Sequence, residues 1–229
     1  MKRVEGRKAL LHVADRTGVV ELGAALIELG FDLVATGPTA TALRQADVKH
    51  GSVSEFIGER LPADALGLLH PKLIAALTDA KPGIDLVAVN LYPLSSATAD
   101  PALSQDEVLA YVDPVGPALL RAAARNFKNV VPLCDPDDYQ QAVDTFKAYD
   151  RMLPDRRQRL AAKAFHYASY YDSTVAQYLG GQWEQFPDEV VVALKKSADL
   201  RYGENPHQAG AFYTLSGARP WGLNAAKLV

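Results

Sequence analysis

The sequence predicts an α/β fold in which a parallel sheet is flanked by helices. Short apolar runs bounded by turn residues alternate with segments of helical period up to about Asp150. This alternation is typical of parallel strands joined by right-handed helical crossovers. The run Ile84–Leu91 is almost continuously apolar, as expected of a strand that is buried on both faces.

The first strand is expected at Lys8–Val13 and the second at Phe31–Ala35, with a helix from about Val19 to Leu29 between them. Gly30 follows that helix in the position of a glycine that ends it. The other elements expected before Asp150 are a helix over Ala40–Ala46, the strand within Ile84–Leu91, a helix over Val115–Asn126, a strand at Asn129–Leu133 and a helix over Asp135–Tyr149.

The pattern changes after Asp150. A long alanine-rich helix is expected over Asp155–Leu179, a strand over Glu189–Leu194, and a shaped loop over Leu200–Gln208. The chain stops at Lys227–Val229 within a helical pattern, so we expect the natural protein to continue. We therefore expect a first domain over residues 1–150, a helical connecting segment over 151–199, and the beginning of a second α/β domain over 200–229.

The composition limits the classes of function. A formal net charge of -3 with interspersed signs provides no basic face for nucleic acid. The single cysteine, Cys134, excludes an intramolecular disulfide and a cysteine-rich metal site. No apolar run approaches the ~20 residues of a membrane span, and the N-terminus lacks the apolar stretch of a signal peptide. We expect a cytoplasmic protein that binds neither nucleic acid, nor a membrane, nor a metal.

Four turns from a strand to a helix are candidates for a ligand site, because ligands of open α/β sheets bind at the carboxyl ends of the strands. They are His12–Gly18, Thr36–Thr39, Asn90–Pro93 and Asp113–Pro117. The first two contain the small, hydroxyl or basic residues that hold a phosphate. Glycine and threonine are also ordinary turn and capping residues, so a purely structural role remains open for both turns.

Three titratable side chains near these turns are candidates for chemistry. Tyr92 follows a buried strand, and Asp113 precedes a helix. A half-buried aromatic residue and a helix-capping carboxylate, worth ~0.3–1 kcal/mol, are the structural alternatives for these two. His70 is either a base or ligand, or a structural residue beside Pro71. The sequence contains no legible catalytic triad and no Walker or GxGxxG phosphate loop.

Six strings, in order, resemble one protein family over essentially the whole chain. They are Val13–Gly18, Thr36–Ala40, Leu69–Lys72, Asn90–Pro93, Arg121–Asn126 and Leu200–Gln208. The family is that of the bifunctional purine biosynthesis proteins, which combine AICAR transformylase with IMP cyclohydrolase. The last string, similar to the opening of the transformylase domain, is the most specific of the six.

This resemblance implies a methylglyoxal-synthase-like domain up to about Asp150, followed by helices that lead to a transformylase domain. In the family, the first domain closes the ring of FAICAR to give IMP and water, without a metal or redox cofactor. The implied partner is a purine-precursor ribotide, namely FAICAR, AICAR or IMP, and the implied assembly is a homodimer. 10-Formyltetrahydrofolate is implied as a co-substrate only if the downstream transformylase domain is present.

The resemblance also implies site residues. Asp113, Tyr92 and Arg125 stand at catalytic positions. The implied substrate-binding residues of the first domain are Asp15, Arg16, Thr17, Thr36, Gly37, Pro38, Thr39, His70, Asn90 and Gly116. Arg201 and Tyr202 correspond to a pair that contacts AICAR in a second site, which further residues of the transformylase domain would complete.

Several positions depart from the family pattern. Ala65–Leu68 stands where the family has Arg-Val-Lys-Thr, so a catalytic lysine is replaced by Gly67. Arg125 replaces a second lysine and, with a pKa above ~12, is a poor proton donor. Arg16 replaces a phosphate-side lysine, and Pro38 removes a backbone N–H donor.

These departures predict a cyclohydrolase of weakened or altered activity on an intact fold. Two alternatives remain. One is a paralogue of specialised metabolism that acts on a modified heterocyclic ribotide, such as a pyrazole analogue. The other is a non-catalytic scaffold or dimerisation domain for a downstream AICAR formyltransferase.

Overall fold

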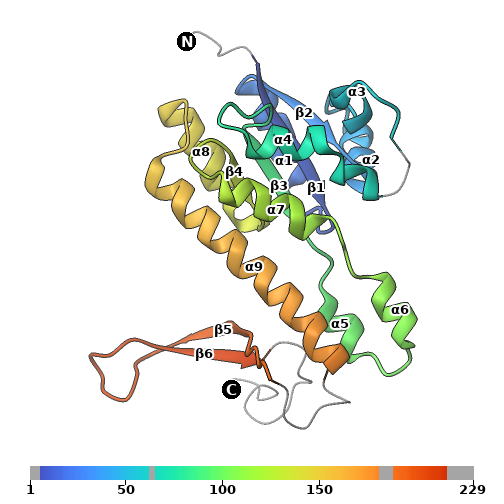
Figure 1. Cartoon of the computed structure of the whole chain (residues 1–229). Coiled ribbons are helices and arrows are strands. Elements are labelled where there is room, and N and C mark those ends of the chain that lie inside the picture. Colours follow the sequence, from blue (N-terminus) through green and yellow to red (C-terminus); the bar gives the residue numbers. More distant parts are fainter. Residues whose placement is uncertain (1–5, 62–64, 181–187, 216–229) are drawn as a thin grey trace. The chain divides into compact units, whose positions relative to one another are not determined.

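The computed structural model in Figure 1 describes residues 6–61, 65–180 and 188–215. Within these residues a four-stranded sheet has the order β2-β1-β3-β4. The strands are β1 (Arg7–Val13), β2 (Phe31–Ala35), β3 (Leu86–Asn90) and β4 (Val131–Leu133). Every neighbouring pair is parallel, so the predicted fold class is confirmed.

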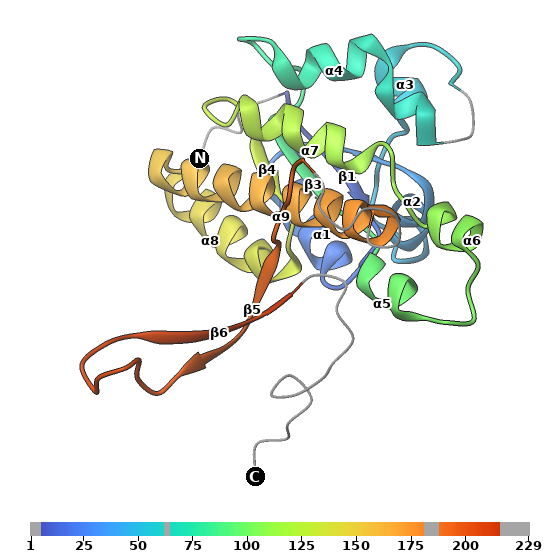
Figure 2. The same ribbon diagram turned by 60° about the horizontal axis from the view of Figure 1, so that its bottom comes forward.

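Helices flank this sheet, with α1 and α8 packed on one face and α4 and α7 on the other (Figure 2). The α-helices are α1 (Val19–Glu28), α2 (Gly37–Gln45), α3 (Val53–Ile57), α4 (Pro71–Thr78), α5 (Leu94–Ala99), α6 (Gln105–Ala110), α7 (Gly116–Arg125), α8 (Tyr139–Tyr149) and α9 (Pro154–Gly180). Two short 3-10 helices are η1 (Ala65–Leu69) and η2 (Pro136–Asp138).

The side chains of β1 alternate between the two faces of the sheet, and this alternation positions the candidate site. Ala9, Leu11 and Val13 are buried in the core cluster formed with α1 and α8. Leu10 and His12 therefore point to the opposite face, where α7 lies. Leu10 is fully buried, whereas His12, near the carboxyl end of the strand, is only partly buried.

The sequence did not predict α3, α4, α5 and α6, each of eight residues or fewer. The strand expected at Glu189–Leu194 is wrong. The three consecutive valines that suggested it, Val190 to Val192, are exposed and belong to no strand. The strand β5 spans Leu194–Leu200 instead and pairs antiparallel with β6 (Gly210–Leu215).

Residue contacts divide the chain into two units. The first contains Met1–Tyr92 and Asp113–Ala168, and includes the parallel sheet; the second contains Pro93–Val112 and Ser169–Val229, and includes β5 and β6. The domain boundaries expected at residues 150 and 199 stay a prediction. The helical pattern expected at the C-terminal end, residues 227–229, lies outside the described residues. In the described parts of the chain, no helix has both the length and the apolar character needed to cross a membrane.

Candidate functional site

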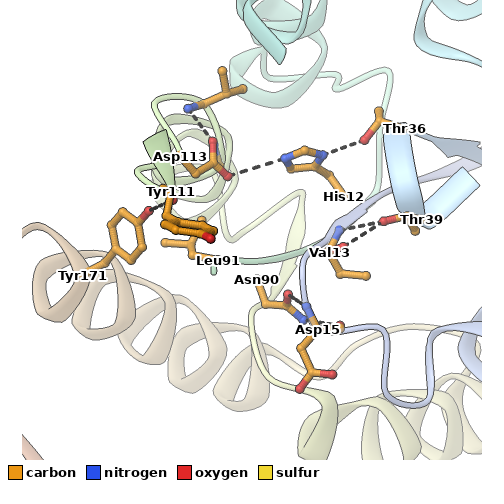
Figure 3. A network of polar contacts seen from close by, with 12 residues as sticks. His12, Val13, Asp15, Thr36, Thr39, Asn90, Leu91, Tyr111, Asp113 and Tyr171 are labelled. Atoms are coloured by element: carbon orange, nitrogen blue, oxygen red, sulfur yellow. Dashed lines mark hydrogen bonds and ion pairs between the residues drawn. The ribbon is translucent and has the colours of Figure 1, made fainter. Parts of the chain in front are cut away.

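Polar side chains of the first unit gather at the carboxyl ends of β1, β2 and β3 (Figure 3). His12 lies at their centre. Its Nδ1 atom is 2.6 Å from Oγ1 of Thr36, the residue between β2 and α2. Its Nε2 atom is 3.6 Å from Oδ2 of Asp113, which precedes α7. The imidazole thus bridges two of the turns that the sequence singled out.

The carboxylate of Asp113 is fixed by the start of α7. Its Oδ1 atom accepts hydrogen bonds from the backbone N–H groups of Val115 (2.8 Å) and Gly116 (2.9 Å). Burial alone would raise the pKa of Asp113, but the hydrogen bonds from His12, Gly116 and Val115 outweigh it and hold that pKa below its ordinary value. Asp113 is therefore a carboxylate at neutral pH, with Oδ2 facing His12.

Gly116 leaves no room for a side chain at this position. A Cβ atom there would lie 2.4 Å from Oδ2 of Asp113 and 2.4 Å from Cδ2 of Leu91. Gly116→Ala should therefore destabilise the protein by about 1–3 kcal/mol through overpacking and displace the Asp113 carboxylate. Urea unfolding would measure the loss. Gly180→Ala is the control, because no atom lies within 4 Å of its added Cβ, and equal stability of the two variants would contradict the expectation.

A second group of contacts joins the ends of β1 and β3. The buried side chain of Asn90 accepts a hydrogen bond from the backbone N–H of Asp15 and donates one to its carbonyl oxygen, both at 2.8 Å. The Asp15 carboxylate in turn accepts hydrogen bonds from the hydroxyl (2.7 Å) and the N–H (2.9 Å) of Thr17, which lower its pKa. These contacts hold the turn that presents the exposed Arg16.

The turn from β2 to α2 carries the other residues expected to hold a phosphate. Thr36 is the N-cap residue of α2, yet its side chain makes no capping hydrogen bond. Gly37 has a φ of 47°, and no atom lies within 4 Å of the place where its Cβ would be. Pro38 offers no N–H. The buried hydroxyl of Thr39 accepts from Val13 N–H and donates to the Val13 carbonyl oxygen, so this side chain ties α2 to β1.

One buried hydroxyl beside the Asp15 turn was not found by sequence reasoning. The hydroxyl of Tyr139 has no hydrogen-bond partner among the described residues, and its ring lies against Gly18 at the start of α1. Burial, together with the nearby charge of Asp15, raises the pKa of Tyr139. In the sequence, Tyr139 occupies an ordinary apolar position at the start of a helix, and no sequence signal distinguishes it.

Three further expected site residues of this unit are His70, Tyr92 and Arg125. His70 caps α4: its Nδ1 accepts from Lys72 N–H (3.2 Å), and its Nε2 lies 3.6 Å from Glu59. Tyr92, 38% exposed, follows β3. Arg125 is the exposed last residue of α7, nine residues after Gly116. A rise of ~1.5 Å per residue puts it about 14 Å from the start of the helix, so the structure does not bring Arg125 to Asp113.

Arg201 and Tyr202 belong to the second unit. They lie just after β5, in the connection to β6, and both are exposed. This connection is held by a hydrogen bond from Gly203 N–H to the Gln208 carbonyl oxygen (2.7 Å) and by one from Gln208 N–H to the Asn205 carbonyl oxygen (3.0 Å). The expected loop is therefore an ordered turn of a hairpin that presents both side chains.

Two family models match this chain. Residues 18–112 match the family model of the MGS-like domain, and residues 123–228 match that of the AICARFT/IMPCHase bienzyme. A similar solved structure is the crystal structure of ForH, with a TM-score of 0.67 and 30% sequence identity. The match covers 77% of this chain and 100% of that chain.

Similar curated proteins carry the name bifunctional purine biosynthesis protein PurH. The one from Lactiplantibacillus plantarum is 36% identical over 97% of this chain, and the one from Chloroflexus aurantiacus is 42% identical over 92%. These matches cover 46% and 44% of the two relatives. The chain therefore spans about half the length of the curated relatives it matches.

Proposed function

Because the chain belongs to the family of bifunctional purine biosynthesis proteins, we propose that its parallel-sheet unit binds a purine-precursor ribotide and closes FAICAR to IMP. The observation that carries the proposal is the cluster of His12, Thr36 and Asp113 at the carboxyl ends of the strands. This is the edge of an open α/β sheet at which ligands bind. The cluster combines a fixed carboxylate with the start of a helix.

The phosphate of the ribotide would lie at the start of α2. Backbone N–H groups at a helix N-terminus attract an anion irrespective of the side chains around them. Gly37 can approach a ligand closely because nothing crowds its Cβ position, and the exposed Arg16 supplies a positive charge from the neighbouring turn. Pro38 reduces the number of N–H donors, which weakens this phosphate site without removing it.

Ring closure needs two kinds of help from the site. The carboxamide nitrogen of FAICAR attacks the formyl carbon and loses one proton, while the formyl oxygen gains negative charge and takes up one proton to become a hydroxyl. This hydroxyl then leaves as water with a second proton, which the former formamide nitrogen loses as the C=N bond forms. We assign the first task to Asp113, whose Oδ2 is an ionised acceptor not used by the start of α7. We assign the second task to Tyr92, whose hydroxyl would donate a hydrogen bond to the formyl oxygen. Arg125 stays outside these steps because it lies at the other end of α7.

A slow reaction is expected, because the site offers no lysine at the two positions that the family uses. Gly67 lies buried in η1 and provides no charge. A missing general acid or charge stabiliser is typically worth 10²–10⁴-fold in rate. The chain should therefore close FAICAR more slowly than the L. plantarum relative by at least roughly 10²-fold. Chromatographic detection of IMP measures this, and turnover within about tenfold of the relative would contradict it.

A binding measurement beside this rate assay separates the alternatives. Calorimetry with IMP and AICAR at millimolar concentration tests ribotide binding directly, and the absence of heat with both ligands would favour the scaffold role. Binding of a ribotide without closure of FAICAR would favour a modified heterocyclic substrate. Each result removes a different part of the proposal, so binding and catalysis are judged separately.

For the second unit, we propose that Arg201 and Tyr202 contact AICAR in a site that is completed by residues further along a protein of the relatives' length. Exposed arginine and tyrosine side chains on an ordered turn suit recognition of a phosphorylated ligand. The co-substrate there would be 10-formyltetrahydrofolate. Residues 1–229 incubated with AICAR and this folate should transfer no formyl group, and measurable formylation would show that the second site is misplaced.

A further inference from the structure

His12 connects the phosphate end of the proposed site to its carboxylate. Figure 3 shows its imidazole between Thr36 and Asp113, with each ring nitrogen directed at one of them. The side chains of His12 and Asp113 are 20% and 19% exposed. The imidazole is therefore shielded from most of the solvent and has two fixed partners.

The partners determine which nitrogen carries the hydrogen when the ring is neutral. A neutral imidazole has one N–H donor and one acceptor nitrogen. An ionised carboxylate only accepts, and hydrogen bonds hold Asp113 in the ionised form. We therefore place the hydrogen of the neutral ring on Nε2, which lies 3.6 Å from Oδ2 of Asp113. The other nitrogen, Nδ1, then accepts the hydroxyl hydrogen of Thr36 over 2.6 Å.

This arrangement uses the only hydroxyl hydrogen that Thr36 has. A phosphate dianion offers only acceptor oxygens, so Thr36 cannot donate to it while its hydrogen is bound to His12. A protonated imidazole donates through both nitrogens. Its Nδ1–H would then donate to Oγ1 of Thr36, and the threonine hydrogen would become available to the phosphate.

We propose that His12 takes up a proton when a ribotide phosphate binds beside Thr36, and so couples the phosphate end of the site to Asp113. The inference rests on the proposed function, because it requires a phosphate at the start of α2. His12 is a positioning residue in this scheme: it orients Thr36 toward the ligand and Asp113 toward the reacting atoms. Since linkage is reciprocal, the proton and the phosphate each strengthen the binding of the other.

Among the contacts that the structure describes, Asp113 is the charged neighbour of His12. Thr36 approaches from the start of α2, and Asp113 from the segment before α7. On the sheet, His12 pairs in register with Val89 of β3, an apolar residue. A phosphate at the start of α2 would add a second negative charge beside the ring, next to that of Asp113.

Calorimetric titration with IMP at pH 7.5, in two buffers of different ionisation enthalpy, tests the inference. A phosphate ester with a second pKa near ~6 is already a dianion at this pH, so its own titration contributes little. We expect a net uptake of protons when IMP binds. Titration with inosine, which lacks the phosphate, should show no uptake.

His12→Gln keeps a neutral hydrogen-bonding side chain that cannot be protonated, so its titration with IMP should show no proton uptake and an affinity lowered by about tenfold. His166→Gln is the matched control, because His166 is an exposed residue of α9, and it should behave as the unmodified protein does. If His12→Gln does not fold, the comparison of IMP with inosine in the unmodified protein still decides.

Two results would overturn the inference while the proposed function stands. One is binding of IMP to the unmodified protein without proton uptake, and the other is unchanged uptake in a folded His12→Gln variant. Absence of IMP binding by the unmodified protein at millimolar concentration would overturn the proposed function, and the inference with it. The set of titrations therefore distinguishes a wrong ligand from a wrong role for His12.

Discussion

Asp113→Asn should reduce the rate of FAICAR closure by roughly 10²–10⁴-fold relative to the unmodified chain. The amide retains an oxygen that can accept the N–H groups of Val115 and Gly116, so the start of α7 should keep its conformation. It cannot take a proton from the attacking carboxamide, and it has no negative charge to face His12. The expected loss is therefore in kcat, measured as IMP formed at saturating FAICAR.

The matched control for this variant is Asp144→Asn, which changes an exposed aspartate on α8 and should leave the rate unchanged. Circular dichroism and urea unfolding would establish that both variants fold. A folded Asp113→Asn variant that retains more than about a tenth of the rate would remove Asp113 from the proposed chemistry. A loss confined to KM would instead assign Asp113 to substrate binding.

Asn90→Asp should cause the largest loss of stability, about 3 kcal/mol at pH 8. The side chain is 4% exposed, and its Nδ2 donates to the Asp15 carbonyl oxygen over 2.8 Å. In the variant a carboxylate oxygen would face that carbonyl oxygen, so the hydrogen bond would become a repulsion between two acceptors. The variant would also bury a negative charge, and the recorded partners of Asn90 in the described part of the chain are backbone groups of Asp15, not cationic side chains.

The pH dependence of this loss has a definite sign. Burial raises the pKa of the introduced aspartate in the folded state, so the destabilisation is relieved as the pH falls and the protonated carboxyl donates to the Asp15 carbonyl oxygen. Urea unfolding at pH 5 and pH 8 would measure both values. Asn129→Asp, at an exposed position, should change stability by less than about 0.5 kcal/mol. Equal and small effects in both variants would show that Asn90 does not hold the Asp15 turn.

The parts of the fold with strong local periodicity could be predicted from the sequence. Strands such as β3 are apolar throughout because both faces of the sheet are covered, and α1 and α8 carry clear helical patterns. Short helices were missed, since five to eight residues contain too little periodicity. The charged strand β5 was also missed, because both of its faces are largely exposed and it shows no alternation of burial.

Prediction of the site was limited by contacts between residues that are distant in sequence. The His12 turn was recognised as a ligand position, but His12 itself acquires its partners from Thr36, 24 residues away, and from Asp113 before α7. Tyr139 lies against Gly18 only because α8 packs beside α1. The catalytic role of Arg125 stays a prediction from its similarity to a family motif, since the structure places it at the far end of α7 from Asp113.

The strand order β2-β1-β3-β4 has a consequence for how this site can change. The chain leaves β1 toward α1 on one face of the sheet, whereas α7 covers the other face beside β3. The strand order changes direction at the boundary between β1 and β3, and ligands of open α/β sheets bind at such boundaries. The hydrogen bonds between Asn90 and Asp15 cross this boundary. Because the strand order alone sets the position of this boundary, replacement of exposed residues beside it, such as Arg16, should change what binds there and leave the fold as it is.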